Sequence, residues 1–366
     1  MRIVYVLPSP TFGMHQYTAD LANRMAAAGH DVSLVTTSTL PRDRYSPAVT
    51  IEAPITTHNT GFSSEGLHIE PYRVLERTIR DLVPDVVHIT GVHLWNVLLV
   101  RRLRTQGLPV IHSLHDLDPH FGVRFGRLIR LWNRLIVANA SHVLVHGQIY
   151  KERLLAGGMA PDRVSYTPLL HLFLSYDEFA ELVDGEVNYE QWALFFGRFE
   201  PYKGVAQLLD AVTKEPSFQS HTPRLVLAGN GALPTRCLEE NPPGIEVRNR
   251  QIEDREAIDL FSRCGLLVLP YLDASQSALI GAAYYFRKPV IVTRTGALAE
   301  YVIDGETGWI VSPGDVTALG NRLSEALSDP TEMKRMGMAG RAWYDRQRIL
   351  EFGILLDMYQ SVVASA

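Results

Sequence analysis

Short apolar runs alternate along the chain with stretches in which apolar residues recur every three or four positions. In the first such unit, residues 2–7 predict a buried strand, Tyr17, Leu21 and Met25 mark one face of a helix, and residues 32–35 predict the next strand. A strand, a helix and a second strand in this order form a βαβ unit. The pattern therefore predicts a parallel sheet covered by helices.

Two series of further strands follow the same rule. We predict strands at residues 85–89, 110–113 and 142–145 in the first half, and at 193–196, 224–228, 246–248, 266–269, 289–293 and 308–311 in the second. Clear periodicity is lost between the two series. We therefore predict two successive α/β domains, at residues 1–170 and 191–342, joined by a linker at 171–190. We expect a long helix at residues 343–366 to brace the domains and return toward the first.

The composition excludes several classes of protein. The 366 residues are 46% hydrophobic and 20% charged, which suffices for two cores, and the net charge of -5 gives no field that would recruit nucleic acid. The two cysteines, Cys237 and Cys264, lack the spacing of metal ligands. Because thiols of this kind stay reduced inside cells, and because the first apolar run is too short for a signal peptide or a membrane span, we expect a cytoplasmic protein.

The loop at residues 197–204, with the sequence GRFEPYKG, joins a predicted strand to a predicted helix at 205–212. A glycine-flanked loop at a helix start can direct free N–H groups and the positive end of the helix dipole at a phosphate group. Arg198 and Lys203 would complete the neutralisation of that phosphate. The alternative is a loop whose two cations only face water.

A second helix start of this kind lies at residues 271–281, with the sequence YLDASQSALIG. Ser275 and Ser277 can cap the helix, and its first free N–H groups remain available to an anion. An ordinary capped helix is the alternative. Two such starts in one domain, together with Arg198 and Lys203, favour a phosphate site.

The loop after the first strand does not fit a dinucleotide site. It contains Gly13 but no G-x-G-x-x-G, and the second strand ends in Thr36 and Thr37 rather than in an acidic residue. We therefore reject a nicotinamide or flavin site. Gly13 would still let a substrate approach the backbone, although a turn that only needs the freedom of glycine explains it as well.

Histidines and aspartates gather just after the strand at 110–113, in the segment HSLHDLDPH at residues 112–120. Ligands bind outside the carboxyl ends of such strands, so His115 is a candidate to face a sugar; a histidine that only bonds the loop backbone is the alternative. Asp116 and Asp118 form a D-x-D, which can hold a divalent cation, but so short a motif arises often by chance. We therefore expect no metal ion.

Arginines recur every three or four residues along residues 124–136, opposite an apolar face that includes Trp132. A basic amphipathic helix can lie on an anionic membrane, which makes this stretch a candidate for peripheral contact with the cytoplasmic face of a membrane. A surface helix with its charged face in water is the more common alternative.

In this order, the motifs resemble the glycosyltransferases of GT-B fold, and specifically glycosyltransferase family 4. The resemblance runs through most of the chain and rests on Gly13, His115, Asp116, GRFEPYKG at 197–204, GNG at 229–231, KPVI at 288–291, GALAE at 296–300 and DGETG at 304–308. It implies two Rossmann-like, doubly wound parallel-sheet domains that face each other across a cleft. It also implies transfer of a sugar, with retention of configuration, from a UDP- or GDP-sugar to a glycan, lipid-linked or small-molecule acceptor in polysaccharide or glycolipid biosynthesis. We expect no cofactor.

The resemblance also implies roles for single residues. Arg198 and Lys203 contact the diphosphate, the backbone near Ile252 receives the base, and the helix start at Ser277 receives the distal phosphate. Gly13 lets the first loop approach the donor, and His115 lies near the transferred sugar. The catalytic candidates are His115, Asp116, Arg198 and Lys203; further donor-binding candidates are Gly229, Asp273, Ser275, Gln276 and Ala278; and the acceptor-side candidates are Thr11, His15 and His120.

One segment departs from the family pattern. The family usually has two glutamates, eight residues apart, before the K-P-V motif, and Ala274 and Ala282 occupy these positions here. The first glutamate normally holds the sugar hydroxyls and the second the ribose. Asp273 could replace the first, and no residue replaces the second, so we expect a variant donor site.

Without a dependable metal motif, the cations and the helix dipole must hold the leaving diphosphate. Our hypothesis is a front-face reaction in which the departing phosphate accepts the proton of the acceptor, in a site completed by domain closure. Three alternatives stay open: a GT-B epimerase that converts a nucleotide sugar without an acceptor, a nucleotide-sugar sensor without turnover, and a two-domain solute-binding protein, which would normally be exported.

Overall fold

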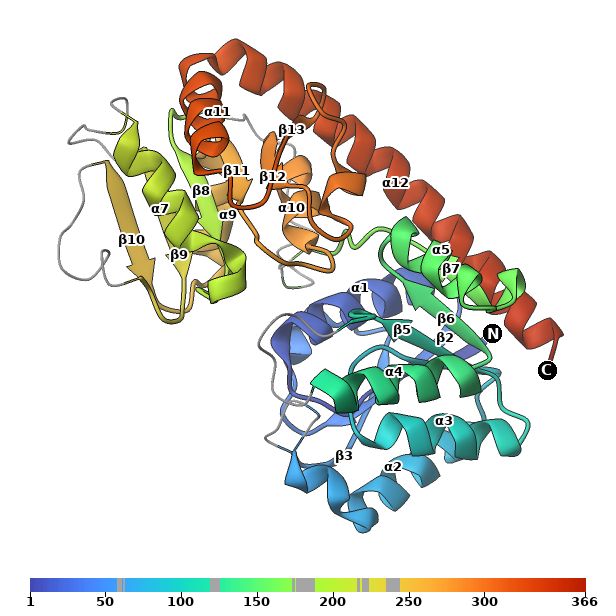
Figure 1. The fold of residues 1–366 in the computed structure, drawn as a ribbon. Helices are drawn as coiled ribbons and strands as arrows, with labels where there is room; N and C mark the ends of the chain where they lie inside the picture. The colour runs from blue at the N-terminus through green and yellow to red at the C-terminus, as the bar shows by residue number, and fades with distance from the viewer. Residues whose placement is uncertain are drawn as a thin grey trace.

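The computed structural model describes residues 1–57, 61, 63–118, 126–172, 175, 188–215, 218, 224–234 and 244–366. It has two domains, each built on a parallel sheet, and a long C-terminal helix that runs along both (Figure 1). The predicted linker at 171–190 lies largely outside the described residues, and the predicted domain boundaries stay predictions.

The first domain contains a seven-stranded sheet in the order β3-β2-β1-β4-β5-β6-β7, and every neighbouring pair is parallel. Its elements are β1 (Arg2–Leu7), α1 (Phe12–Ala27), β2 (Asp31–Thr37), η1 (Arg42–Arg44), β3 (Thr50–Ile55), η2 (Ser64–Leu67), α2 (Ile69–Asp81), β4 (Val86–Ile89), α3 (Trp95–Thr105), β5 (Val110–Leu114), α4 (Gly126–Asn139), β6 (His142–Val145), α5 (Gln148–Ala156), η3 (Pro161–Arg163) and β7 (Val164–Tyr166).

The second domain contains a six-stranded sheet in the order β10-β9-β8-β11-β12-β13, again with parallel neighbours. Its elements are β8 (Ala193–Phe196), η4 (Pro201–Lys203), α7 (Val205–Lys214), β9 (Leu225–Gly229), β10 (Ile245–Asn249), α9 (Asp254–Arg263), β11 (Leu266–Leu269), α10 (Ala278–Tyr285), β12 (Val290–Thr293), η6 (Leu298–Tyr301), β13 (Gly308–Val311) and α11 (Val316–Ser328), followed by α12 (Pro330–Ala364).

Both sheets reverse their strand order beside their first strand. In the first domain β1 lies between β2 and β4, and in the second domain β8 lies between β9 and β11. At such a point the connections leave the sheet toward opposite faces, so that the carboxyl ends of the two strands border a binding crevice. In the second domain, the loop after β8 and the loop after β11 lie at this point, and they are the two loops that the sequence predicts as phosphate sites.

The apolar pattern predicts most of the strands because buried parallel strands are continuous apolar runs. It misses two strands at the edges of the first sheet. β3 has the sequence TIEAPI, in which a glutamate and a proline interrupt the apolar run, and β7 is only three residues long. Edge strands tolerate such residues because one side of each strand is not paired.

The last helix begins at Pro330 rather than at residue 343, and the predicted start is wrong. The Asp329 side chain accepts a hydrogen bond from the Glu332 N–H at 3.0 Å, and Pro330 takes the first helical position. Two glycines in the first part of this helix do not favour a helix by sequence alone, and both are explained by close packing. A Cβ at Gly337 would lie 1.9 Å from the Arg287 carbonyl oxygen, and one at Gly340 would lie 2.4 Å from the Tyr284 ring.

The helix α12 contacts both domains. In the second domain, the Trp343 ring packs 5.5 Å from the Tyr284 ring, measured between centroids. In the first domain, Arg348 donates two hydrogen bonds to Asp20, at 2.7 and 2.8 Å, and Tyr359 shares a buried 2.8 Å hydrogen bond with Tyr5. The helix thus crosses from one domain to the other, and its end lies beside the N-terminus (Figure 1).

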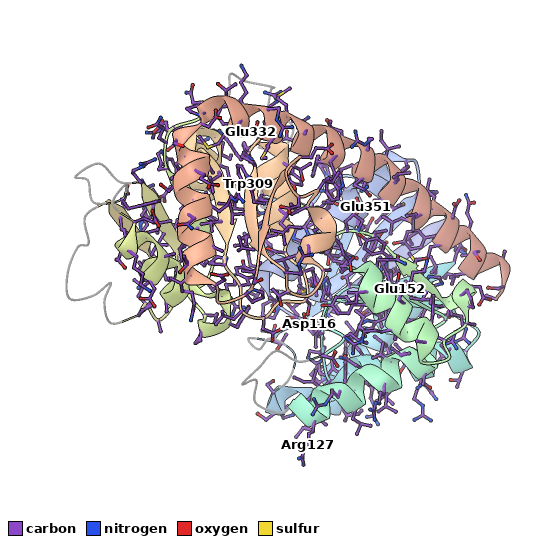
Figure 2. The ribbon with its side chains drawn as sticks, turned by 45° about the horizontal axis from the view of Figure 1, so that its top comes forward. Asp116, Arg127, Glu152, Trp309, Glu332 and Glu351 are labelled. Atoms are coloured by element: carbon purple, nitrogen blue, oxygen red, sulfur yellow. The ribbon has the colours of Figure 1, made fainter. Side chains whose placement is uncertain are left out.

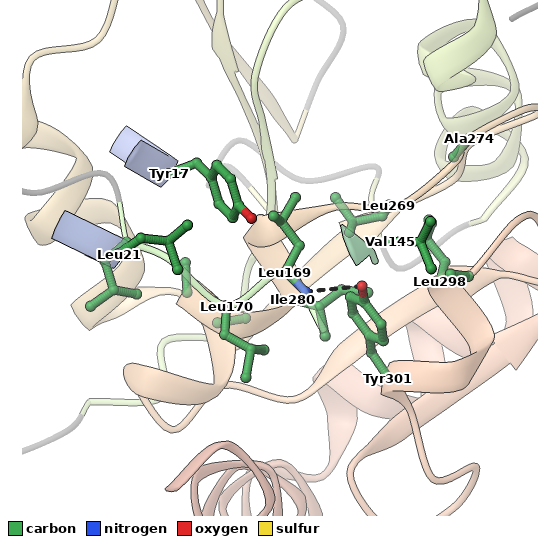
Figure 3. Close-up of a cluster of buried hydrophobic side chains, with 14 of the residues drawn as sticks. Tyr17, Leu21, Val145, Leu169, Leu170, Leu269, Ala274, Ile280, Leu298 and Tyr301 are labelled. Carbon is green, nitrogen blue, oxygen red and sulfur yellow. Dashed lines mark hydrogen bonds between the residues drawn. The ribbon is translucent and has the colours of Figure 1, made fainter. Parts of the chain in front are cut away.

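The apolar cores of the two domains meet. Figure 3 shows Tyr17, Leu21, Val145 and Leu169 of the first domain in one buried cluster with Leu269, Ala274, Ile280, Leu298 and Tyr301 of the second. The Tyr301 hydroxyl accepts the Leu169 N–H at 3.0 Å and donates to the His146 carbonyl oxygen. This contact fixes η6 of the second domain against the end of β6 in the first.

Candidate functional site

Three loops of the second domain pack tightly together at the carboxyl edge of its sheet. Gly204 has φ 70°, and a Cβ there would lie 1.9 Å from the Pro270 carbonyl oxygen in the loop after β11. Gly229 has φ 149°, and a Cβ there would lie 1.9 Å from the Gly197 carbonyl oxygen in the loop after β8. Only glycine fits at either position. Gly229 therefore holds the other loops in place, and its predicted donor contact stays a prediction.

Four N–H groups of the loop at 197–204 donate to acceptors within the protein. The N–H of Phe199 donates to Asn230, that of Glu200 to Arg198, that of Lys203 to Glu200 and that of Gly204 to Pro201, at 2.7 to 3.2 Å. These groups are satisfied inside the protein. These four amides are therefore not available to an anion, whereas the two cationic side chains of the loop are.

The two cations of this loop differ in environment. Arg198 is largely exposed, with its guanidinium 3.5 Å from the Glu200 carboxylate. Lys203 is half-buried, and its ammonium lies over the Tyr271 ring, 5.3 Å from the centroid. Burial lowers the pKa of Lys203 from its ordinary value. Among the described residues, no carboxylate lies within ion-pair distance of its Nζ. A partly desolvated ammonium without a counter-ion, between the ends of β8 and β11, is suited to bind an anion.

The start of α10 supplies the free amides. Ser277 occupies the N-cap position, but its side chain makes no cap hydrogen bond, so the predicted serine cap is wrong. The first N–H groups of a helix have no partner within the helix, and Ala278 carries the first of them here. The Gln276 Oε1 atom is buried and has no hydrogen-bond partner in the described structure. It can accept a hydrogen bond from a ligand.

The segment before α10 also holds the positions in which the family has glutamates. Ala274 and Ala282 are both buried, and Ala282 lies inside α10. Asp273 is half-buried in the same loop, and its N–H lies 3.4 Å from the Tyr202 carbonyl oxygen. The loop thus brings Asp273 close to the segment that carries Lys203.

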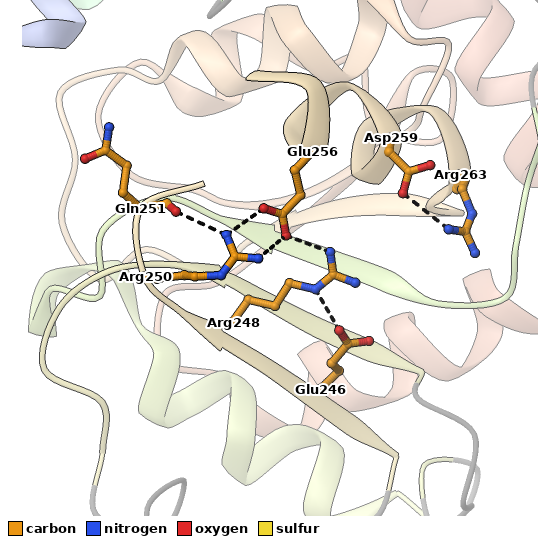
Figure 4. Close-up of polar contacts among 7 residues, drawn as sticks. All are labelled: Glu246, Arg248, Arg250, Gln251, Glu256, Asp259 and Arg263. Carbon is orange, nitrogen blue, oxygen red and sulfur yellow. Dashed lines mark hydrogen bonds and ion pairs between the residues drawn. The ribbon is translucent and has the colours of Figure 1, made fainter. Parts of the chain in front are cut away.

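Ile252 lies in the turn between β10 and α9, and this turn is braced by ion pairs (Figure 4). Glu256 accepts two hydrogen bonds from Arg250, at 2.6 and 2.7 Å, and one from Arg248 at 2.9 Å. These bonds, that of Arg250 first, lower the pKa of the Glu256 carboxyl. The turn is therefore fixed on both sides of Ile252, which is half-buried.

In the first domain, Gly13 lies in the first turn of α1, with no atom within 4 Å of the position of a Cβ. The alternative explanation, a turn whose backbone conformation requires glycine, does not apply to Gly13, because its φ is not positive. Open space above the backbone agrees with close approach of a ligand. Thr11 occupies the N-cap position without capping the helix, and its hydroxyl bonds Ser9 at 2.7 Å. His15 is fully buried and bonds the Tyr45 hydroxyl at 2.8 Å, so here its ring faces the core.

His115 is 4% exposed, and its Nε2 lies 2.9 Å from the Thr90 carbonyl oxygen. Because a carbonyl only accepts, Nε2 carries the proton, and the bare Nδ1 has no partner in the described structure. Burial lowers the pKa of His115. The ring is therefore neutral near pH 7, with an acceptor nitrogen available to a hydroxyl group.

Sequence reasoning missed the residues around His115. The Tyr17 ring packs 4.8 Å from His115, 5.1 Å from His146 and 5.8 Å from His171, between centroids. His146 follows β6 at the same sheet edge at which His115 follows β5, and this placement is the signal that could have revealed it. Its Nε2 is also buried without a partner in the described structure.

The two aspartates of the D-x-D motif lie in different surroundings. Asp118 is paired with Arg153 at 2.6 Å, whereas Asp116 lies between the two domains (Figure 2). Across the described ranges, no three His, Cys, Asp or Glu side chains are grouped as metal ligands. His120, which is an acceptor-side candidate, lies outside the described residues.

The structure therefore brings most of the predicted site to facing sheet edges. Tyr150 of the first domain connects them, because its hydroxyl donates to the Ser275 carbonyl oxygen at 3.1 Å. Burial raises the pKa of Tyr150 to about 12, and the charge of Asp116 contributes in the same direction. His115 and Asp116 thus lie on the first-domain side of the α10 start. A cationic loop, free helix amides and neutral acceptors in one place can bind a phosphorylated, hydroxyl-rich ligand.

Comparison with known proteins gives matches over most of the chain. Residues 12–169 match the family described as Glycosyl transferase 4-like domain, and residues 190–329 match Glycosyl transferases group 1. An uncharacterized glycosyltransferase of Methanocaldococcus jannaschii is 30% identical over 43% of each chain. The GDP-mannose:glycolipid 4-beta-D-mannosyltransferase of Xanthomonas campestris pv. campestris is 27% identical over 58% of each chain. The chain thus matches about half the length of these relatives. The D-inositol 3-phosphate glycosyltransferase of Acidothermus cellulolyticus is 24% identical over 87% of this chain and 78% of that protein.

Solved structures share the whole fold. Sucrose-phosphate synthase from Thermosynechococcus elongatus superposes with a TM-score of 0.74 over 100% of both chains, at 21% identity. Anabaena HepE in complex with UDP and glucose superposes with a TM-score of 0.70 over 96% of this chain and 99% of that chain, at 17% identity.

Proposed function

Because the chain belongs to the GT-B glycosyltransferases of the family 4 type, we propose that it transfers a sugar from a UDP- or GDP-sugar to a glycan, lipid-linked or small-molecule acceptor, with retention of configuration. The observation that carries this proposal is the half-buried Lys203 ammonium beside the uncapped start of α10. Burying an ammonium without a counter-ion costs free energy, which a bound anion recovers.

The leaving diphosphate is the anion that best fits this place. Lys203 and Arg198 supply two positive charges, and the first amides of α10 supply hydrogen bonds and the positive end of a helix dipole. The braced turn at Ile252 is the place for the base. The bare Nδ1 of His115 and the Oε1 of Gln276 are acceptors for sugar hydroxyls.

The chemistry follows from these groups. The bond between the anomeric carbon and the leaving phosphate oxygen breaks, and the acceptor oxygen bonds to that carbon on the same face. The acceptor hydroxyl gives its proton to the departing phosphate oxygen. Lys203, Arg198 and the α10 amides stabilise the negative charge that develops on the diphosphate. His115 stays neutral, so its Nδ1 accepts a hydrogen bond from a hydroxyl group, and the ring neither takes up nor releases a proton in the reaction.

The test is a transfer assay with a panel of UDP- and GDP-sugars. We expect the double variant Arg198→Ala, Lys203→Ala to keep its fold, because Arg198 is largely exposed and Lys203 has no ion pair among the described residues, and to lose transfer. Full activity in this variant would refute the assignment. Conversion of the donor without any acceptor would instead favour an epimerase, and binding without turnover on any acceptor would favour a sensor.

The donor panel is needed because the comparisons point in two directions. One relative is named as GDP-mannose dependent, and one solved structure of the same fold holds UDP. The buried alanines at the two glutamate positions remove the side chains that normally contact ribose and sugar. A ligand at a hundred times its dissociation constant stabilises the folded state by about 2.7 kcal/mol, so thermal shifts can rank the donors before any acceptor is known.

The helix α4 favours a lipid-linked acceptor. Its inner face packs in the first domain, where the buried Trp132 donates to the His93 carbonyl oxygen at 3.1 Å. Its outer face carries leucines as well as arginines: Leu128, Leu131 and Leu135 are 47%, 53% and 37% exposed, next to Arg127, Arg130 and Arg134. Figure 2 shows Arg127 at the outer edge of the domain, pointing away from it. No helix in the described ranges is apolar over a length that would span a bilayer.

Exposed leucines beside arginines distinguish α4 from a helix whose outer face is only charged, and they suit the surface of an anionic bilayer. We propose that α4 rests on such a surface. We expect the protein to co-sediment with vesicles of phosphatidylglycerol and phosphatidylcholine, and Leu131→Gln to weaken this binding. The control is Ile349→Gln on α12, which removes a residue that is 75% exposed. Equal binding by both variants would contradict the proposal.

A further inference from the structure

The first turn of α5, in the first domain, is bonded to the second domain. Its Gln148 and Ile149 N–H groups donate to the two carboxylate oxygens of Glu300, at 2.6 and 2.9 Å. A carboxylate at the start of a helix also interacts favourably with the helix dipole. The residue before the helix, Gly147, packs so closely that a Cβ there would lie 2.7 Å from the Ala297 Cβ. The start of α5 therefore has a fixed position relative to the second domain.

From this position α5 reaches the segment that leads into α10. Tyr150 is buried, and its hydroxyl donates to the Ser275 carbonyl oxygen at 3.1 Å. The same oxygen accepts the Ala297 N–H at 2.8 Å. One carbonyl is thus held by a hydrogen bond from each domain.

The Ser275 carbonyl controls the direction of the α10 amides. Only Gln276 and Ser277 separate it from the first helical residue, and Ser277 is not held by a side-chain cap. On the other side of the segment, Gly296 has φ 49°, and a Cβ there would lie 1.9 Å from the Ala274 carbonyl oxygen. Close packing thus fixes one side of the segment, and among the described residues the Tyr150 bond is the hydrogen bond that reaches it from the opposite domain.

We propose that Tyr150 is a positioning residue for the distal phosphate of the donor. It acts through Ser275 and aims the first α10 amides at that phosphate when the two domains are arranged as they are here. The inference rests on the proposed function and extends it, because it makes the grip on the leaving group depend on a residue of the first domain. A substitution of Tyr150 should therefore weaken the binding of ligands that have a distal phosphate and leave the binding of ligands without one unchanged.

The experiment measures the dissociation constants of UDP, GDP, UMP and GMP by calorimetry for the wild type and for Tyr150→Phe. This change removes one hydroxyl and keeps the ring. The matched control is Tyr189→Phe, which removes a 2.7 Å hydrogen bond to the Arg287 carbonyl oxygen just before β12, at the opposite edge of the second sheet. Both variants lose one tyrosine-to-carbonyl bond, so a general loss of stability would affect both alike.

We expect Tyr150→Phe to weaken the binding of the preferred nucleoside diphosphate about fivefold, which is the effect of one neutral hydrogen bond, and to leave the corresponding monophosphate unchanged. Tyr189→Phe should change neither constant. Unchanged diphosphate binding in Tyr150→Phe, or an equal loss for monophosphate and diphosphate, would overturn the inference while the proposed function stands. A wild type that binds neither UDP nor GDP would overturn both.

Discussion

Replacing Lys203 with methionine separates binding of the diphosphate from stability of the fold. Methionine keeps the length and most of the volume of the side chain and removes the charge. In the free protein the Lys203 ammonium has no carboxylate within ion-pair distance among the described residues, and burial lowers its pKa. A lowered lysine pKa means that the charged side chain destabilises the folded state at neutral pH. This destabilisation is lost as the pH rises toward the ordinary lysine pKa. The free variant should therefore be at least as stable as the wild type at pH 7.

The effect on ligand binding should have the opposite sign. A hydrogen bond to a charged group contributes about 1.5–3 kcal/mol, which corresponds to a roughly 10- to 150-fold increase in the dissociation constant of the diphosphate. At a ligand concentration a hundred times the wild-type dissociation constant, the wild type gains about 2.7 kcal/mol of stability. A variant with hundredfold weaker binding would gain only about 0.4 kcal/mol at the same concentration.

Thermal denaturation with and without UDP or GDP measures both quantities. The control is Lys214→Met, which makes the same chemical change on an exposed residue at the end of α7. We expect Lys214→Met to match the wild type in both measurements. The reasoning would be refuted if Lys203→Met bound the diphosphate within twofold of the wild type, or if it lost stability without ligand and bound weakly for that reason.

Two further predictions concern buried charges elsewhere. Lys288 is fully buried, and burial lowers its pKa to about 8. The free energy of unfolding of the wild type, relative to that of Lys288→Met, should therefore rise by roughly 3 kcal/mol between pH 8 and the ordinary lysine pKa, at about 1.36 kcal/mol per pH unit. A difference in unfolding free energy that stays constant across this range in urea melts would contradict the prediction. Arg44 stacks on Phe12 in the first domain and pairs with Asp254 of the second, beside the turn of Ile252. The Arg44→Ala variant should therefore release bound nucleotide faster in stopped-flow experiments, and its release rate should depend less on the salt concentration. An unchanged release rate would exclude a role of this ion pair in holding the two domains together.

The sequence predicts those parts of the fold and site that depend on local patterns. Buried parallel strands are short apolar runs, and helices repeat their apolar residues every three or four positions, so most elements could be placed. The start of α12 could not, because Gly337 and Gly340 reflect contacts with Arg287 and Tyr284 that are far away in the sequence. The loops that carry Lys203 and Ser277 could be recognised because each lies between a strand and a helix.

The details within those loops depend on pairings over long distances and were missed. The Tyr150 bond to Ser275 spans 125 residues, and the Glu300 bond to Gln148 spans 152, and neither leaves a local signal. The serine cap was predicted from residue type alone, but the Ser277 side chain makes no cap hydrogen bond in the structure. Likewise, the Phe199 N–H in the loop after β8 donates to the Asn230 carbonyl oxygen, which the packed loops bring near.

A crystal structure of the protein with its preferred nucleoside diphosphate tests the central claim most directly. We predict that the distal phosphate lies within hydrogen-bond distance of Lys203 Nζ and of the first amides of α10, with Arg198 beside it. A diphosphate bound away from Lys203, or one bound through a metal ion on Asp116 and Asp118, would contradict this account.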